Sequence, residues 1–409
     1  MTAPPLASGV EPRSAPPVPR ALREAVRIWW REIDKVLLFL IVLLMALGMV
    51  AVLAASPAGG KQYAVSEFAF FQRHIVFQLL GLGLMLAVSF VSRPDARRLG
   101  ILLAAVMLFL LLLVPLIGAE KNGARRWLDF GISLQPSEFL KPGFAILLAW
   151  MLSWRLRDTS LPVVGYATLT MALVAALLMM QPNLGATILF AGVWFVLVLL
   201  SGISPARIGA LIAGGLGALT AAYLFYDNAR YRIDSFFGGG TAFDQVDLAQ
   251  RTLLAGGWTG SGLWLGTRKM NLPEAHTDYI FSVIGEEFGL VTCAIILALY
   301  LAIIVRALIR LVGEEDLFAL LAGAGLATVI GGQAFINMAV NLQLFPSKGM
   351  TLPLISYGGS STLAVCLTCG LLLAITRRNP FLGRDRGGLS ELLAGPKTTL
   401  QPGERGHRA

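Results

Sequence analysis

Charged residues are scarce in this chain, which excludes an ordinary soluble protein. Only 14% of its 409 residues are charged and 56% are hydrophobic. A soluble domain is typically about a quarter charged. The mean hydropathy of +0.71 is typical of a protein that crosses the bilayer several times. The net charge is +9, but no basic module with interleaved aromatic residues appears, so nucleic-acid binding is not expected.

Cysteine and histidine are also rare, and their placement argues against metal or redox chemistry. Cys293, Cys366 and Cys369 all lie inside apolar runs, where small buried packing residues are expected. The three histidines lack the spacing of metal ligands. The sequence has no P-loop, nucleophile elbow or dinucleotide fingerprint. No required cofactor is therefore expected, although a divalent cation is compatible with the sequence.

Long apolar runs dominate the chain, and they predict an all-α polytopic membrane protein with about ten transmembrane helices. A span needs roughly 17–25 mostly apolar residues. Runs of this kind lie at 36–56, 75–92, 99–118, 138–154, 162–180, 184–203, 206–226, 279–307, 317–341 and 353–376.

The distribution of arginine and lysine predicts the orientation of these spans. Basic residues precede the first span and follow the second, fourth, eighth and tenth. Because such residues favour the cytoplasmic side, both termini are predicted to be cytoplasmic. Three loops, 119–137, 227–278 and 342–352, then lie outside. These outer loops also carry basic residues, which favours an anionic ligand at the outer membrane surface.

Three parts of the chain are expected. Residues 1–35 are a cytoplasmic tail with a short amphipathic segment, and residues 379–409 are a disordered cytoplasmic tail. Residues 36–378 form the membrane domain. Its one large extracytoplasmic loop, 227–278, is rich in glycine, which favours flexible or re-entrant backbone over a phosphate cradle.

The segment 271–287 carries acids at the mouth of a span and inside it. Thr277 is expected to cap the helix, with Asp278 in its first turn, so Asp278 is either a helix-capping acid or a general base at the membrane boundary. On an ideal helix, Asp278, Ser282 and Glu286 share one face. Glu287 points the other way and is expected to be a structural ion-pair partner.

Two other segments could build a polar site on the same side. Arg125 and Arg126 flank an aromatic residue, and Glu138 and Lys141 stand three positions apart. Either Glu138 and Lys141 form a salt-bridged helix start, or Arg125, Arg126 and Lys141 hold a phosphate or pyrophosphate head group.

The third segment, 343–361, holds an exposed turn around Lys348 and a run of small residues that begins at Ser356. The small residues permit close helix packing or line a polar cavity.

Four stretches of sequence are similar to the signature segments of a known family. They are LPEAHTDYIFSVIGEEFGL (272–290), FPSKGMTLPLISYGGSS (345–361), NGARRWLDFGISLQPSEFLK (122–141) and QPNLGATILF (181–190). Together they resemble the SEDS family of shape, elongation, division and sporulation proteins, over roughly residues 36–380. The phrases resemble the division branch more than the elongation branch. The glycine-rich stretch 235–250 departs from the family pattern, because it lacks an expected segment with proline and tryptophan.

The resemblance implies a peptidoglycan glycosyltransferase that polymerises lipid II into glycan strands during septal wall synthesis. The transfer would invert the anomeric carbon and release undecaprenyl pyrophosphate on the outer face of the cytoplasmic membrane. The implied partners are a class B penicillin-binding protein, which is a transpeptidase, and other divisome proteins. Two alternatives stay open from the sequence: a lipid II flippase and a non-catalytic divisome scaffold.

The residues and the resemblance together predict one site. Asp278 is the predicted base, since it occupies the position of the family's essential aspartate. The residues predicted to bind substrate are Glu274, His276, Thr277, Arg125, Arg126, Lys141, Lys348, Ser356 and Glu286. No metal ligand is predicted.

Overall fold

The computed structural model describes most of the chain. The described residues are 18–121, 124–129, 131, 133–156, 158, 160–238, 241–346 and 349–378. The predicted tail 379–409 and the predicted substrate contact Lys348 therefore lie outside them. The chain divides into two units, one of residues 1–33 with 377–409 and the other of residues 34–376.

In the first unit, helix α1 (Val18–Glu32) covers most of the predicted amphipathic segment. Within this unit, Arg377 Nε lies 3.9 Å from Glu32 Oε2, and the backbone N–H of Arg378 donates to the carbonyl oxygen of Glu32 at 3.3 Å.

The second unit confirms an all-α membrane protein. Each of the ten predicted spans corresponds to one long helix among the described residues. These helices are α2 (Lys35–Tyr63), α3 (Ala69–Ser89), α4 (Arg93–Ile117), α5 (Pro136–Ser153), α6 (Val163–Met179), α7 (Leu184–Leu200), α8 (Pro205–Phe225), α11 (Ile280–Leu311), α12 (Leu317–Asn341) and α13 (Gly359–Ile375). Seven are long and apolar enough to cross a membrane, and α6 and α7 are shorter apolar helices. Helices suit the bilayer because every backbone polar group is satisfied within the segment.

The helices are not equally buried. Among the helices long and apolar enough to cross a membrane, α12 and α13 are the most enclosed. In α12, 72% of the apolar 18-residue stretch is buried, and in α13 78%, whereas α8 has no buried residue. α13 packs against α3, and α5 packs against both α4 and α12. α12 and α13 therefore supply the interior wall on which a site can be built.

Asp34 fixes the start of α2. Its carboxylate accepts the N–H groups of Val36 and Leu37 and pairs with Arg306 at 2.8 Å and with Arg310, both on α11. Burial alone would raise the pKa of Asp34, but the bonds from Arg310, Leu37 and Arg306 lower it below its ordinary value. Asp34 thus holds the start of α2 against the end of α11 that carries Arg306 and Arg310.

The loops between the spans contain secondary structure that the sequence did not indicate. Before α5, described residues form a small antiparallel sheet in the order β1-β2-β3, made of β1 (Ala119–Lys121), β2 (Ala124–Asp129) and β3 (Ser133–Leu134). A 3-10 helix, η1 (Trp154–Leu156), follows α5, and another, η2 (Arg268–Asn271), precedes α11.

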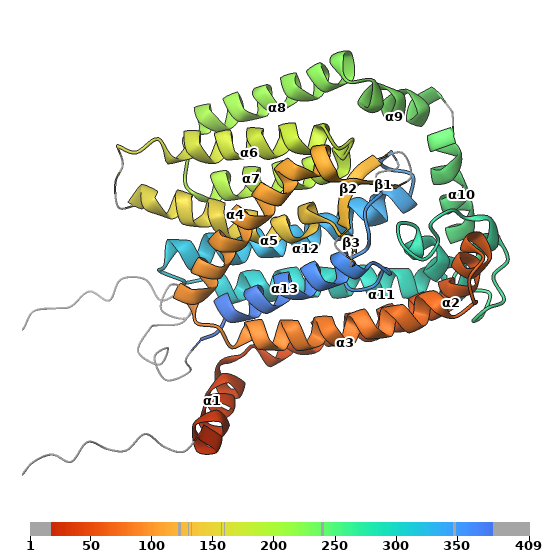
Figure 1. Ribbon diagram of the computed structural model, residues 1–409, viewed down its shortest axis with the longest axis horizontal. Coiled ribbons are helices and arrows are strands. Elements are labelled where there is room, and N and C mark those ends of the chain that lie inside the picture. The colour runs from red at the N-terminus through yellow and green to blue at the C-terminus, as the bar shows by residue number, and fades with distance from the viewer. Residues whose placement is uncertain are drawn as a thin grey trace, which may run out of the picture. The chain divides into compact units, whose positions relative to one another are not determined.

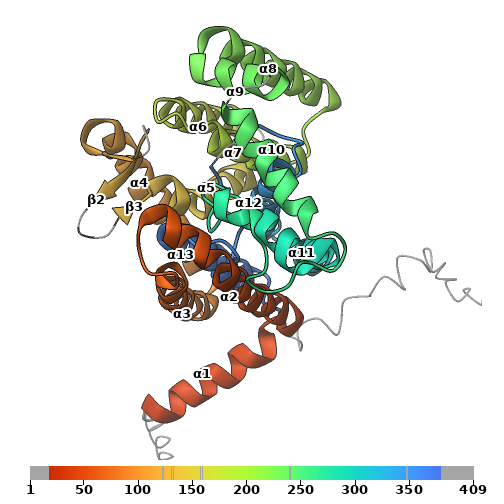
Figure 2. The ribbon, with the colours of Figure 1, turned by 90° about the vertical axis from the view of Figure 1, so that its right-hand side faces the viewer.

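The expectation of flexible or re-entrant backbone across 227–278 is wrong for its first half. Helices α9 (Asp227–Gly238) and α10 (Thr241–Ala255) occupy it. Val246, Ala249 and Leu253 of α10 are buried at helical spacing, which gives α10 an apolar face that packs on α11. Figure 1 shows α9 and α10 at one end of this unit, and Figure 2 looks onto that end, with α10 beside α11.

The glycines of the second half permit close backbone approach to α11. Gly289 has φ 82° and ψ 171°, so α11 is broken there. Leu290 N donates to Gly257 O at 2.9 Å, and Gly262 N donates to Glu287 O at 3.0 Å. A Cβ at Gly260 would lie 2.2 Å from Glu287 O. The glycines therefore serve packing against the broken helix.

Candidate functional site

The turn that carries Asp278 precedes α11 instead of opening it. α11 begins at Ile280, and its N-cap residue, Tyr279, makes no side-chain cap bond. The prediction that Thr277 caps this helix is therefore wrong. Glu274 has φ +52°, and its carbonyl oxygen accepts the N–H groups of Thr277 and Tyr279, so the chain turns before the helix can start.

The backbone of Asp278 is held by two amide side chains of α12. Asn337 Nδ2 donates to the Asp278 carbonyl oxygen at 2.8 Å, and Asn341 Nδ2 donates to it at 3.1 Å. Ser282 Oγ donates to Asn341 Oδ1 at 2.7 Å and is fully buried. The predicted common face of Asp278, Ser282 and Glu286 is thus wrong, because Asp278 lies outside the helix and Ser282 faces α12.

Asp278 lies on the wall of a cavity of about 640 Å³. Pockets for small ligands are typically about 300–1,000 Å³. The lining residues come from the turn before α11, the small sheet, the segment 349–358 and the start of α13. They are Phe77, Ala124, Arg126, Trp127, Ser133, Leu134, Gln135, Phe139, Gln245, Pro273, Glu274, Thr277, Asp278, Tyr279, Gly349, Thr351, Tyr357, Gly358, Gly359, Ser360, Ser361 and Leu363.

Four of the predicted site residues meet in this cavity: Asp278, Glu274, Thr277 and Arg126. A Cβ at Gly349 would lie 3.5 Å from Asp278 Oδ2 and 3.9 Å from Arg126 Nη1, so the carboxylate and the guanidinium flank the same point. The cavity thus places a carboxylate next to a guanidinium.

Of the two predicted arginines, only Arg126 lines the cavity. Its Nε donates to Gln181 O at 3.0 Å and its Nη2 donates to Pro182 O at 2.5 Å, which fixes β2 to the hairpin between α6 and α7. Arg125 is exposed and lies 3.4 Å from Glu120. Successive residues of a strand point to opposite faces, which separates the two side chains.

Glu274 is held from two sides within the cavity wall. Tyr63 Oη, at the end of α2, donates to Glu274 Oε1, and Thr277 Oγ1 donates to Glu274 Oε2 at 2.7 Å. Tyr63 was not predicted, because α2 and the turn are more than 200 positions apart.

His276 does not line the cavity. It is 2% exposed, and its ring stacks on Phe70 with the centroids 4.0 Å apart. Burial lowers the pKa of His276 to about 4, against an opposing effect of the Glu274 carboxylate. Its carbonyl oxygen accepts the N–H of Tyr357 at 3.0 Å. The structure therefore places His276 behind the turn, where it supports the backbone.

Ser356 has a similar supporting place. Its Oγ donates to the carbonyl oxygen of Thr277 at 2.6 Å and accepts the N–H of Leu352 at 2.8 Å. It is 4% exposed and does not line the cavity. Ser356 thus joins the segment before α13 to the turn that carries Asp278.

Glu286 and Glu287 bind the loop that precedes the turn. Glu286 accepts the backbone N–H groups of Arg268 and Lys269 at 2.7 and 2.8 Å. Glu287 pairs with Lys269 Nζ and accepts the N–H of Trp264. Both glutamates are buried, so the structure gives Glu286 a structural place like the one predicted for Glu287, although Glu287 pairs with the loop and not with another span.

Lys141 lies behind the cavity wall. It is 3% exposed, pairs with Glu138 at 2.6 Å as its spacing predicted, and donates to Gln333 Oε1 on α12 at 2.8 Å. Lys141 does not line the cavity. It is linked to the cavity wall through Gln333, which donates a hydrogen bond to Thr351.

Across the part of the chain that the structure describes, no group of three His, Cys, Asp or Glu side chains is placed to hold a metal ion. The expectation about cofactors stays a prediction.

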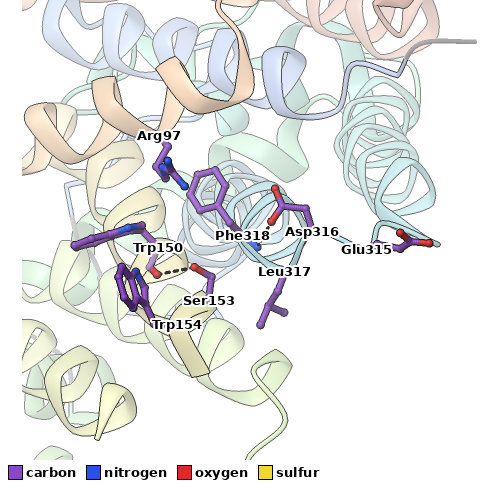
Figure 3. Close-up of a pocket in the computed structure, with 8 residues that line it drawn as sticks. All are labelled: Arg97, Trp150, Ser153, Trp154, Glu315, Asp316, Leu317 and Phe318. Atoms are coloured by element: carbon purple, nitrogen blue, oxygen red, sulfur yellow. Dashed lines mark hydrogen bonds between the residues drawn. The ribbon is translucent and has the colours of Figure 1, made fainter. Parts of the chain in front are cut away.

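A second cavity, of about 430 Å³, contains none of the predicted site residues. Figure 3 shows its lining at the start of α4, the end of α5 and the start of α12. Arg97 lies over the Phe318 ring at 5.7 Å from the centroid, and Ser153 Oγ donates to Trp150 O. By the predicted orientation this cavity lies on the cytoplasmic side, so the cavity with Asp278 is the candidate site.

Comparisons with known proteins identify the family to which the chain is similar. The family model described as "Cell cycle protein", for FtsW, RodA and SpoVE, matches residues 34–380. A "Probable peptidoglycan glycosyltransferase FtsW" of Caulobacter vibrioides is 37% identical over 364 residues, covering 88% of this chain and 93% of that protein. Another, of Halorhodospira halophila, is 37% identical over 360 residues, covering 84% and 90%.

Solved structures are similar over most of their length. One, described as "Structural coordination of polymerization and crosslinking by a peptidoglycan synthase complex", has a TM-score of 0.69 and 30% identity, covering 84% of this chain and 97% of that chain. The rod shape determining protein RodA of Thermus thermophilus has a TM-score of 0.64 and 29% identity, covering 88% and 99%.

Proposed function

The chain belongs to the FtsW/RodA/SpoVE family of cell cycle proteins, and on that premise we propose how it works as a peptidoglycan glycosyltransferase. It polymerises lipid II into glycan strands for septal wall synthesis, with Asp278 as the general base. The observation that carries this assignment is that Asp278 and Arg126 flank one point in a cavity of about 640 Å³.

The charges of Asp278 and Arg126 suit the attacking hydroxyl and the leaving pyrophosphate, respectively. The Asp278 carboxylate accepts the proton of the attacking sugar hydroxyl as the new glycosidic bond forms. The donor's bond from the anomeric carbon to the pyrophosphate oxygen breaks at the same time, with inversion. Arg126 stabilises the charge that develops on the leaving pyrophosphate. Since pyrophosphate is already a good leaving group, no second acid is needed.

The site is proposed to open on the outer face of the cytoplasmic membrane. The arginine-rich ends of the helices lie at the opposite side of the predicted topology. Glu274 and Thr277, which line the cavity next to Asp278, hold the turn in place at the membrane boundary. A lipid-linked sugar pyrophosphate could then reach the base without leaving the bilayer.

The proposed partner is a class B penicillin-binding protein, which would cross-link the strands that this chain makes. This proposal is supported by the similarity of the chain to a solved peptidoglycan synthase complex that coordinates polymerisation and crosslinking. Other divisome proteins are proposed to bring this pair to the septum.

The test uses the purified full-length chain with its penicillin-binding partner and labelled lipid II. Wild type should make glycan polymer, and Asp278→Asn should make none, because the amide has the same shape but cannot accept the proton. Expression, melting temperature and partner binding should be unchanged. Polymer at the wild-type rate from Asp278→Asn would remove Asp278 from the reaction. Transport of lipid II in liposomes without any polymer would favour the flippase.

A further inference from the structure

A chain of hydrogen bonds leads from the buried Lys141 to the wall of the cavity. Lys141 Nζ donates to Gln333 Oε1 at 2.8 Å. Gln333 Nε2 donates to the carbonyl oxygen of Thr351 at 3.0 Å and to its hydroxyl oxygen at 3.3 Å. The hydroxyl oxygens of Thr351 and Ser361 are 2.6 Å apart. Lys141 and Gln333 are buried, whereas Thr351 and Ser361 line the cavity.

The chemical groups on either side of Gln333 fix the donor and the acceptor in each of its hydrogen bonds. A lysine ammonium can only donate, so the amide atom that faces Lys141 is oxygen. The backbone carbonyl of Thr351 can only accept, so the amide atom that faces Thr351 is nitrogen. The side chain of Gln333 therefore has one orientation, and it presents N–H groups to Thr351.

The orientation of Gln333 then determines which of the Thr351 and Ser361 hydroxyls donates to the other. Gln333 supplies the proton of its hydrogen bond to Thr351 Oγ1. The hydroxyl protons of Thr351 and Ser361 are therefore both available for other hydrogen bonds. One of these two protons makes the bond between them, and the other remains. A hydroxyl that accepts a hydrogen bond is a stronger donor, which favours Thr351 donating to Ser361. The Ser361 hydroxyl is then the end of the chain, with its proton directed at the cavity.

The neighbouring Ser360 shows a different arrangement. It also lines the cavity, but its Oγ donates to the carbonyl oxygen of Ser133 at 2.9 Å and accepts the N–H of Gln135 at 3.3 Å. Its hydroxyl is used to join α13 to the small sheet. Of the two adjacent serines, Ser361 is thus the one whose proton the protein directs towards a ligand.

We propose that Ser361 is a substrate-binding residue that donates a hydrogen bond to an oxygen of the lipid-linked sugar pyrophosphate, and that Lys141 and Gln333 are positioning residues that set the direction of this donor. The inference rests on the proposed function, since it takes the substrate from there. The acceptor is either a phosphate oxygen or a sugar oxygen. The positioning role also accounts for the place of Lys141, which is buried beside Gln333 and does not line the cavity.

Gln333→Glu offers a direct test of the direction. A carboxylate still accepts from Lys141 but has no N–H to give to Thr351. Thr351 would then donate to the carboxylate, Ser361 would donate to Thr351, and the cavity would lose its donor. Gln333→Glu should therefore have the same effect as Ser361→Ala, although Gln333 does not touch the cavity.

The experiment measures lipid II polymerisation by the full-length chain with its penicillin-binding partner. Ser361→Ala and Gln333→Glu should each lower kcat/KM about tenfold, mainly through KM. The double variant should be no worse than either single one, because both remove the same hydrogen bond. Ser361→Thr, which keeps the hydroxyl, should retain most of the activity. Thr368→Val on the same helix, where the hydroxyl donates only to Ala364 O at 2.7 Å, serves as the control for loss of a hydroxyl.

Inhibition by undecaprenyl pyrophosphate distinguishes the two acceptors. Weaker inhibition of Ser361→Ala than of wild type would assign the bond to a phosphate oxygen, and equal inhibition would assign it to a sugar oxygen. Wild-type kinetics for Ser361→Ala, or losses that multiply in the double variant, would overturn the proposal. If wild type itself makes no polymer, the proposed function fails first, so the two failures are distinguishable.

Discussion

Asn337 Nδ2 lies 2.8 Å from the carbonyl oxygen of Asp278 and 2.6 Å from the carbonyl oxygen of Met350. One buried amide on α12 thus holds the turn that carries Asp278 and the segment that carries Gly349. Since a Cβ at Gly349 would lie 3.5 Å from Asp278 Oδ2, this amide joins the backbone of Asp278 to a segment that lies beside its carboxylate.

Asn337→Leu should lower kcat about 10- to 100-fold with a small change in KM. Misplacing a catalytic group by about 1 Å can cost a hundredfold in rate. Steady-state polymerisation kinetics would check this. Thr328→Val on the same helix, whose hydroxyl bonds only Ala324 O, is the matched control. A rise in KM alone would mean that Asn337 serves substrate binding and not the position of Asp278.

Arg126→Gln should raise KM for lipid II at least tenfold, because it removes the cation that lies beside Asp278 in the cavity. Arg125→Gln should change it less than about twofold, because an exposed ion pair contributes little. The two neighbours thus make a matched pair in one kinetic assay. Equal effects of both substitutions would contradict the assignment of Arg126 alone to the site.

Lys269→Met should destabilise the protein by about 3–5 kcal/mol, because it leaves the buried carboxylate of Glu287 without its partner. Thermal melting in detergent would show a clear fall in Tm. The double variant Lys269→Met with Glu287→Gln should recover part of the loss.

Arg268→Met is the control for this ion pair, since Arg268 is exposed and contributes only its backbone N–H to Glu286. It should melt near the wild-type temperature. An equal fall in Tm for both single variants would show that the loop, and not the buried pair, sets the stability.

His276 should make the protein less stable in acid. Its pKa falls from 6.5 to about 4 on burial, so the unfolded chain binds its proton at a higher pH than the folded one. The contribution is fully present above pH 6.5 and is lost as the pH falls to 4 and below, to a total of about 3 kcal/mol. His276→Phe should lose less Tm between pH 7 and pH 4 than wild type does. Parallel melting curves for the two proteins over this range would contradict this account.

The sequence by itself determined the membrane architecture. Span length and hydropathy are local properties, so each of the ten predicted runs became one helix. The same is true of the Glu138–Lys141 pair, which follows from a three-residue spacing on α5. The signature segments also placed Asp278, Glu274, Thr277 and Arg126 at one site, and the structure brings these four together.

Only the tertiary structure decided what each side chain does there. Arg125 and Arg126 are adjacent in sequence, and the strand β2 alone separates their roles. Glu286 and Lys141 carry the charges expected of substrate contacts, but each meets a buried partner, from a loop 17 positions away or from a helix 192 positions away. The proposed direction of the Ser361 hydroxyl depends on contacts between α5, α12, Thr351 and α13. A hydrogen bond needs atoms within about 3 Å, and the order of residues along a chain does not state which distant segments come that close.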